Sequence, residues 1–390
     1  MPSGPLGRPR PPSACQCGTV RVGYELTGLE LDAAGTRRTV GRLRHELEAG
    51  PVDLVPLSHP RRPRTRGLGS VARGLSRELA YLPVGLPRRA ARLRLDLLHC
   101  PTALAPVRSA MPLVLTVNDV MALEHPGWFT RANVLQQRLV LGAAARGAAM
   151  VICPSAFTRD RVVERLRVER SRTRVVPWGV DESFSPGPRD DAALERLGVT
   201  GRYLLTVGTL QPRKNLEAAL AAFERLPAGD GVELVVAGSR GWRDEALVAR
   251  IATSPAAGRI RLPGRVSEPD LVALYRGAEC FVYPSRYEGF GLPPLEAMAC
   301  GTPVVAADRT SVPEVVGDAG VLVDPDDGAA LAAALARLLS SGSVRAEASA
   351  RGRERAARFT WARCAEGTLA TYADALARER RRSRRSTSRQ

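Results

Sequence analysis

Several features are missing from this sequence, and each absence removes a class of protein. No apolar run reaches the roughly 18 residues that would span a bilayer. The start of the chain is rich in Pro and Arg and has no apolar signal-peptide core, which predicts a disordered leader over residues 1–18 and no secretion. The seven cysteines are odd in number and scattered, and the four histidines lack metal-ligand spacing. We therefore expect a reduced, cytoplasmic protein without a protein zinc site.

Lysine is almost absent from the chain. Of the 57 Lys and Arg residues, Lys214 is the only lysine. This replacement indicates a coding bias toward arginine, so individual arginines carry little meaning and the single lysine draws attention. The net charge of +17 favours an anionic partner. Residues 378–390 carry seven Arg and one Glu and supply +6 of that charge. They predict a solvated, disordered tail, or alternatively peripheral contact with the anionic inner face of a membrane; nucleic acid is the less favoured partner.

The order of apolar runs and helical patterns predicts an α/β protein with two domains. The chain of 390 residues is too long for one ordinary core. In the second half, apolar runs alternate with helical patterns, one of which opens with a capping-box-like Ser267 and Asp270. The predicted strands of this half lie at 203–208, 232–238, 259–264, 280–285, 303–308 and 320–325. This order indicates a parallel sheet covered on both faces, as in a Rossmann-like fold.

The first half repeats the plan less regularly. Its predicted strands lie at 21–26, 52–58, 96–100, 112–117, 149–155 and 173–180. A helix is expected near 38–49, an interdomain linker at 181–191 and a helix with an aromatic-lined face at 359–376. The Arg- and Pro-rich segment 60–94 has no clear assignment. The halves together predict two Rossmann-like parallel sheets.

Polar clusters follow four of the predicted strands, at the point where each strand should end. They are Arg213 with Lys214, Glu288, Asn118 with Asp119, and the segment 32–38. In open parallel sheets, ligands bind at the carboxyl ends of the strands. The four clusters therefore predict one ligand site along the rims of the two sheets.

The stretch SRYEGFGLPPLEAMACG, residues 285–301, suggests what that ligand is. Gly289 and Gly291 allow a tight turn, and the two prolines can begin a helix where their missing N–H groups matter little. Free amides and the helix dipole at that point favour a phosphate or sugar oxygen. Glu288 and Glu296 flank the turn, and carboxylates accept hydrogen bonds from hydroxyl groups. With two cations at the same rim, the pattern predicts a nucleotide-sugar.

Simpler interpretations exist for several of these residues. Glu288 and Glu296 would then be solvated surface residues, and Arg213 with Lys214 an ordinary helix-start pair. Asp119 would only cap a turn. We interpret two further residues, His125 and Trp178, as packing residues and not as chemical groups.

The stretch EGFGLPPLEAMACGTPVV, with Glu288 and Glu296 separated by seven residues, carries a family resemblance. Together with the upstream VGTLQPRKNLE and VVPWGVDESFSP, it resembles the retaining glycosyltransferases of family GT4, which have the GT-B fold. The resemblance covers about residues 20 to 378. It implies two Rossmann-like domains facing a central cleft, and transfer of a sugar from a nucleoside diphosphate to an acceptor hydroxyl with retention, without metal or other cofactor.

The resemblance also implies domain limits and roles for residues. The expected domains are 19–182 for the acceptor, 183–356 for the donor, and a helix at 357–377 that crosses back to the first domain. Catalytic roles fall on Arg213, Lys214, Glu288, Asn118 and Asp119. Donor binding falls on Gly208, Thr209, Arg265, Val266, Gly289, Phe290, Gly291, Leu292 and Glu296, with Gly35 and Arg37 in a loop of the first domain. Arg213 and Lys214 would hold the diphosphate, Glu288 the sugar hydroxyls and Glu296 the ribose.

Two positions depart from the family pattern. Asn118 stands where the family commonly has histidine, and an amide can hydrogen-bond but cannot carry a proton at neutral pH. Arg37 stands at the second glycine of a Gly-x-Gly-Arg loop, where it would either clamp a phosphate or obstruct the donor. We expect a hexosyltransferase using GDP-mannose or a UDP-hexose, with an acceptor that the sequence does not identify. The alternatives are a nucleotide-sugar epimerase of the GT-B fold and a degenerate GT-B module that binds an anionic surface.

Overall fold

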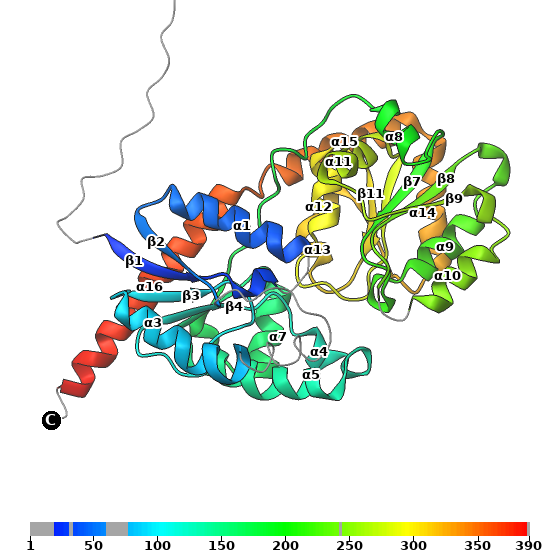
Figure 1. Ribbon diagram of the computed structural model, residues 1–390. Coiled ribbons are helices and arrows are strands. Elements are labelled where there is room, and N and C mark those ends of the chain that lie inside the picture. Colours follow the sequence, from blue (N-terminus) through cyan, green and yellow to red (C-terminus); the bar gives the residue numbers. More distant parts are fainter. Residues whose placement is uncertain (1–18, 31–33, 60–76, 242–243, 388–390) are drawn as a thin grey trace, which may run out of the picture.

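The computed structural model contains two α/β halves, each built on a six-stranded parallel sheet (Figure 1). It describes residues 19–30, 34–59, 77–241 and 244–387, so the predicted leader at 1–18 lies outside the described residues. The strand order is β2-β1-β3-β4-β5-β6 in the first sheet and β12-β11-β10-β7-β8-β9 in the second. The predicted fold class is confirmed.

The N-terminal sheet consists of strands close to the predicted ones. They are β1 (Val20–Glu25), β2 (Val52–Leu57), β3 (Leu97–Cys100), β4 (Leu113–Thr116), β5 (Met150–Cys153) and β6 (Thr173–Val175). The helical segments are η1 (Thr27–Glu30), α1 (Ala34–Glu48), η2 (Arg77–Gly85), α3 (Leu86–Arg92), α4 (Met121–Glu124), η3 (Pro126–Trp128), α5 (Arg131–Gln136), η4 (Gln137–Leu141), α6 (Gly142–Gly147), α7 (Ala156–Leu166) and η5 (Arg170–Arg172). Part of the unassigned segment 60–94 is thus helical, and residues 60–76 are outside the described residues.

The C-terminal sheet follows the predicted alternation. Its strands are β7 (Tyr203–Val207), β8 (Glu233–Ala237), β9 (Ile260–Gly264), β10 (Cys280–Tyr283), β11 (Val304–Ala307) and β12 (Val321–Val323). The helical segments are α8 (Asp191–Arg196), η6 (Pro212–Lys214), α9 (Leu216–Glu224), η7 (Ala228–Asp230), α10 (Glu245–Ala252), η8 (Ala257–Arg259), α11 (Glu268–Gly277), α12 (Leu292–Ala299), α13 (Val312–Val316), η9 (Gly317–Ala319), α14 (Gly328–Ser340), α15 (Gly342–Ala356) and α16 (Trp361–Thr387). The side chain of Ser267 caps α11 by accepting from the amide of Asp270, as predicted.

Both sheets are buried on two faces, which explains their continuous apolar strands. In β3, β4, β5, β10 and β11 every residue is buried. One face of the N-terminal sheet packs against α1 and α16, and the other packs against α3, α6 and α7. Helices α11, α12 and α13 cover one face of the C-terminal sheet, and Phe184 of the linker packs into the same core. Helices α9, α10 and α14 cover the opposite face. This arrangement leaves the carboxyl ends of the strands for a site.

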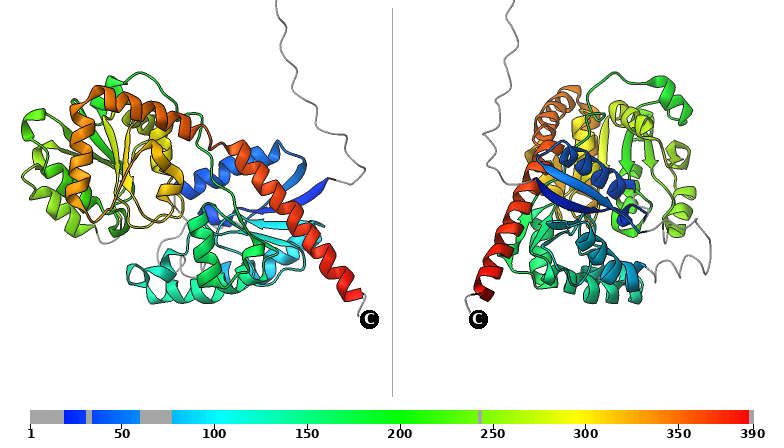
Figure 2. Two further views of the ribbon diagram at one scale, coloured as in Figure 1. Left: turned by 180° about the vertical axis from the view of Figure 1, so that it is seen from behind. Right: turned by 60° about the vertical axis from the view of Figure 1, so that its left-hand side comes forward.

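Helix α16 returns from the C-terminal half and runs along the N-terminal sheet (Figure 2). Trp361 and Tyr372 are buried there. Gly179 lies so close to the start of the helix that a Cβ atom would sit 2.3 Å from the Trp361 nitrogen. The predicted disordered tail is wrong for residues 378–387, because α16 continues to Thr387. Arginine is a good helix former, and no Gly or Pro interrupts this stretch once packing has fixed the preceding turns.

A buried polar network fixes α16 to the sheet, and it yields a prediction for stability. The Tyr372 hydroxyl lies 2.7 Å from His99 Nδ1, and His99 Nε2 lies 2.9 Å from Thr116 Oγ1. Burial lowers the pKa of His99 to about 3, so the ring is neutral at pH 7. Replacing Tyr372 with Phe leaves a buried nitrogen without a partner and should destabilise the protein by about 1–3 kcal/mol. Urea unfolding measures the loss, and an unchanged midpoint would contradict it.

Candidate active site

A buried cluster of charge lies at the carboxyl ends of β7 and β10, the two central strands of the C-terminal sheet. Glu288 Oε1 accepts hydrogen bonds from Arg213 Nη1 at 2.7 Å, Lys214 Nζ at 2.8 Å and Ser285 Oγ at 2.6 Å. Arg213 and Lys214 belong to η6 after β7, whereas Ser285 and Glu288 follow β10, and these two strands are neighbours. The structure therefore brings together three residues that the sequence placed at one rim.

The electrostatics of this cluster fix its protonation at neutral pH. Burial alone would raise the pKa of Glu288, but Arg213 and Lys214 hold that pKa at about 2. Burial, aided by the Arg213 charge, lowers the pKa of Lys214 to about 8 despite the opposing Glu288. The Lys214 ammonium also donates to the Tyr283 hydroxyl at 2.7 Å. Two cations share one carboxylate, so the cluster keeps an excess positive charge for an anion.

The turn after Glu288 has the geometry that the sequence suggested. Gly291 adopts φ +119° at the start of α12, a conformation that favours glycine, and prolines follow in the first helical turn. Ser311 Oγ donates to the carbonyls of Glu288 and Phe290, both at 2.8 Å, and so fixes the loop. The backbone amides of 290–292 donate to no other group in the described part of the chain. They are available to a ligand oxygen.

The N-terminal domain contacts this turn directly. Ser155 Oγ and Thr158 Oγ1 donate to the Gly289 carbonyl at 2.7 and 2.9 Å. At the start of α7, the amides of Ala156 and Phe157 donate to the Glu314 carboxylate at 2.7 and 2.6 Å. None of these contacts was predicted from the sequence. The cap residue Ser155 was a local signal for the start of α7, but its partner depends on how the two domains meet.

Asn118 and Asp119 lie on the N-terminal side of the same junction. A Cβ atom on Gly289 would sit 2.0 Å from the Asn118 carbonyl oxygen, so only glycine fits there. Asn118 Oδ1 is buried and has no hydrogen-bond partner among the described residues. Asp119 Oδ1 accepts from the Met121 amide at 3.0 Å, which is the turn-capping role considered from sequence. Burial raises the pKa of Asp119, while the Met121 amide and Arg213 oppose that shift.

Glu296 forms a second buried site one turn into α12. Its side chain accepts from the Tyr275 hydroxyl at 3.1 Å and from Arg38, which reaches it from α1 in the other domain. Burial raises the pKa of Glu296, and Arg38 and Tyr275 act against the rise. Arg38 also lies 3.8 Å from Glu268 and 5.1 Å from the centre of the Phe184 ring. Arg38 was not among the predicted site residues.

The predicted loop with Gly35 and Arg37 is wrong, because both residues lie in the first turn of α1. Arg37 is exposed and donates to the Leu29 carbonyl at 3.2 Å, whereas the next residue, Arg38, faces Glu296. Successive helical residues point about 100° apart, so only one of two adjacent arginines can face the cleft. The RR pair was visible in the sequence, but the phase of the helix was not.

The remaining predicted residues are more peripheral. Gly208 lies against Lys214, since a Cβ there would be 3.1 Å from Lys214 Cε. Thr209 and Val266 are half-buried, and Arg265 is exposed. Phe290 is buried, with its ring 5.4 Å from Trp178, and Leu292 packs partly against the same core. This contact and the stacking of His125 on Trp128 at 4.1 Å agree with the packing roles expected of Trp178 and His125.

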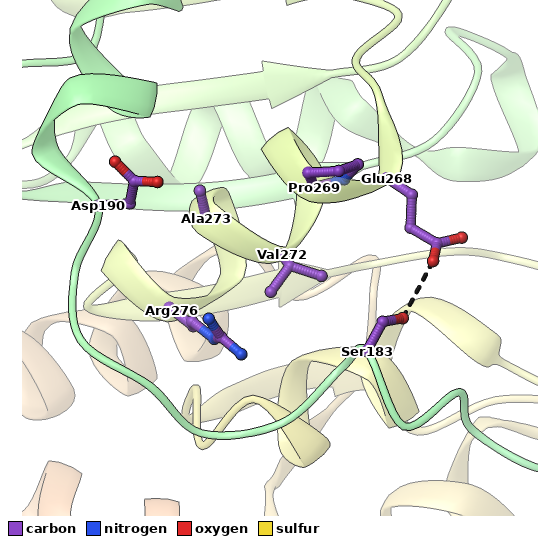
Figure 3. Close-up of a pocket in the computed structure, with 7 residues that line it drawn as sticks. All are labelled: Ser183, Asp190, Glu268, Pro269, Val272, Ala273 and Arg276. Atoms are coloured by element: carbon purple, nitrogen blue, oxygen red, sulfur yellow. Dashed lines mark hydrogen bonds between the residues drawn. The ribbon is translucent and has the colours of Figure 1, made fainter.

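A pocket of about 310 Å³ lies beside α11 and the linker (Figure 3), and no residue of the Glu288 cluster lines it. Two of its lining residues are joined by a hydrogen bond, which Ser183 donates to Glu268 at 3.0 Å. The pocket is lined by Ser183, Asp190, Glu268, Pro269, Val272, Ala273 and Arg276, none of them a predicted site residue. Within the described ranges, no three His, Cys, Asp or Glu side chains gather as a metal site. No helix in the part of the chain that the structure describes is long and apolar enough to cross a bilayer.

Known proteins match both halves. The protein-family model described as Glycosyltransferase Family 4 matches residues 28–184, and the family model described as Glycosyl transferases group 1 matches residues 192–355. O-antigen chain mannosyltransferase B of Escherichia coli is 34% identical over 264 residues, 66% of this chain and 69% of that protein. A D-inositol 3-phosphate glycosyltransferase of Acidothermus cellulolyticus is 37% identical over 290 residues, 70% of this chain and 64% of that protein.

The fold also matches solved structures. Sucrose-phosphate synthase from Thermosynechococcus elongatus superposes with a TM-score of 0.76 at 22% identity, covering 92% of this chain and 99% of that chain. The two family models lie on the two Rossmann-like halves, and the rim residues described above lie within them. The chain belongs to glycosyltransferase family 4 and is a glycosyltransferase of the GT-B fold.

Proposed function

We propose that the protein transfers a hexose from a nucleoside-diphosphate sugar to an acceptor hydroxyl, with retention of configuration and without a metal. The observation that carries this proposal is the buried Glu288 cluster, with two cations beside the unpaired amides of 290–292. Arg213 and Lys214 would neutralise the diphosphate and its growing charge as the sugar leaves. The backbone amides at the start of α12 would donate to the phosphate oxygens of the diphosphate.

The other predicted donor contacts follow from this placement. Glu288 would accept from the sugar hydroxyls, Glu296 from the ribose hydroxyls, and the Arg265–Val266 turn would lie along the base. The relative from Escherichia coli is a mannosyltransferase, which supports GDP-mannose as the first donor to test, with a UDP-hexose as the alternative. A nucleotide-sugar would be a substrate, and we propose no other cofactor.

Retention is supported by the poor bases in the site. Asn118 has an amide that cannot take a proton, and Asp119, whose pKa burial raises, already accepts the Met121 amide with Oδ1. Glu288, with a pKa of about 2, is a weak base at neutral pH. The strongest proton acceptor near the reacting carbon would be the departing diphosphate. The acceptor oxygen would then bond to that carbon on the face that the diphosphate leaves, and its proton would pass to a phosphate oxygen, which retains the configuration.

The test is a transfer assay with GDP-mannose and UDP-hexoses in the presence of a chelator, read by NMR. Selective use of one donor, with a product of the donor's own anomeric configuration, is the expected result. An inverted product or a requirement for metal would contradict the mechanism. Conversion of the donor's sugar without any acceptor would instead support the epimerase. Failure of any nucleotide to bind would favour the degenerate, surface-binding module.

We also propose a lipid-linked or polysaccharide acceptor at the inner face of a membrane. The end of α16 projects beyond the N-terminal domain (Figures 1 and 2), and its residues Arg380, Arg381, Arg382 and Arg384 are exposed. On the same domain, Leu135, Leu139 and Val140 are exposed on α5 and η4 near Arg131 and Arg138. Arginines attract anionic lipid headgroups, and exposed aliphatic side chains can enter the interface.

The tail of α16 provides a prediction for this surface. Replacing Arg380, Arg381, Arg382 and Arg384 with Gln should weaken binding to anionic vesicles, because each arginine contributes about 1 kcal/mol near such a surface. The control replaces the same four with Lys, which keeps the charge and should keep the binding. Cosedimentation at two salt concentrations measures both variants. Equal binding by the Gln variant and the wild type would contradict a role for the tail.

A further inference from the structure

Arg38 joins the two domains at the proposed ribose site. It is the fifth residue of α1, whose N-terminal end approaches α12 and α13 (Figure 1). Its guanidinium donates to Glu296 on α12, lies 3.8 Å from Glu268 on α11, and covers the Phe184 ring in the linker. One side chain of the N-terminal domain thus contacts three separate parts of the other half.

Glu296 has partners for both oxygens without any ligand. It is 3% exposed, its Oε2 accepts from Tyr275, and its Oε1 accepts from Arg38. A buried carboxylate is costly unless it is hydrogen-bonded, so the Arg38 contact stabilises the nucleotide-free protein. A ribose hydroxyl that binds Glu296 Oε1 must displace that contact. The guanidinium resembles a diol in presenting adjacent donors to a carboxylate.

We propose that Arg38 is a stand-in for the donor ribose, which holds the Glu296 carboxylate and the two domains together until a nucleotide replaces it. The inference rests on the proposed function, since it assumes that Glu296 receives the ribose. Glu268 is the partner to which Arg38 can turn on release, because its carboxylate is near and half-exposed. Breaking the Arg38–Glu296 contact then reduces the favourable free energy of donor binding by the free energy of that contact.

The test is calorimetric titration of Arg38→Met with GDP and UDP. Removing the competing guanidinium should lower the Kd on the order of tenfold, for whichever of the two nucleotides the wild type binds. This is the scale of a hydrogen bond to a charged group. Arg38→Lys keeps a cation and should fall between the two. The matched control is Arg42→Met, one turn further along α1, where the arginine pairs with Asp181 and not with Glu296. Its affinity should equal that of the wild type.

A double substitution separates this competition from a general loosening of the domains. If Arg38 acts through Glu296, Arg38→Met should not tighten binding when Glu296 is already Gln. Tightening in both backgrounds, or weaker or unchanged binding by Arg38→Met, overturns the inference while the nucleotide site stands. Circular dichroism checks that each variant is folded. Absence of binding by the folded wild type and all variants overturns the proposed function, and this inference with it.

Discussion

Replacement of Lys214 with Ala is expected to lower kcat/KM for sugar transfer by about a hundredfold or more, the usual loss when one donor to a developing negative charge is removed. The Lys214 ammonium is buried, 2.8 Å from Glu288 and 2.7 Å from the Tyr283 hydroxyl, so it is held in one place before the donor arrives. Arg213 stays in the variant and keeps Glu288 paired, so the fold should survive. Steady-state kinetics and thermal unfolding measure the two effects.

The matched control is Arg286→Ala, which removes a cation two residues before Glu288. Arg286 is exposed and pairs with Asp326 at 3.3 Å, outside the buried cluster. Its kcat/KM should stay near the wild-type value. The wild type also offers a check by pH: with a Lys214 pKa of about 8, the ammonium is lost as pH rises through that value, and nucleotide affinity should fall. Equal activity of Lys214→Ala and Arg286→Ala would refute the assigned role.

The sequence predicted the sheets and the rim because both follow from local patterns. Buried parallel strands appear as short apolar runs, and a parallel sheet places their carboxyl ends at one edge. The approach of Glu288 to Arg213 and Lys214 therefore needed only the assumption that their strands are neighbours, which the pairing of β7 with β10 bears out.

Features that depend on the meeting of the domains could not be predicted in this way. The choice of Arg38 over Arg37 depends on the phase of α1 against α12, and the hydrogen bonds from the start of α7 to Glu314 depend on domain placement. The helical end of α16 was missed for another reason. A run of arginines is compatible with disorder or with a helix, and the packing of earlier turns such as Tyr372 decides between them.

Replacement of Glu296 with Gln is expected to weaken nucleotide binding by about 10- to 100-fold, because hydrogen bonds from hydroxyls to a carboxylate are stronger than those to an amide. Gln fills nearly the same volume, so the core around Tyr275 and Leu295 should stay packed. The matched control is a second ligand, a 2′,3′-dideoxynucleotide, which has no 2′- or 3′-hydroxyl group to donate to residue 296. It should bind the wild type and Glu296→Gln with similar, weak affinity.

The comparison of the two ligands separates a ribose contact from a general effect of the substitution. Loss of affinity for the ribonucleotide alone places the ribose on Glu296. Equal losses for both ligands would instead mean that the residue acts by shaping the start of α12, near the amides that face the phosphates. Unchanged binding of both would remove Glu296 from the site. Because Gln has no negative charge to pair with Arg38, the Glu296→Gln variant should also lose the ion pair that joins α1 to α12. A lower unfolding temperature without nucleotide would then accompany the loss of affinity.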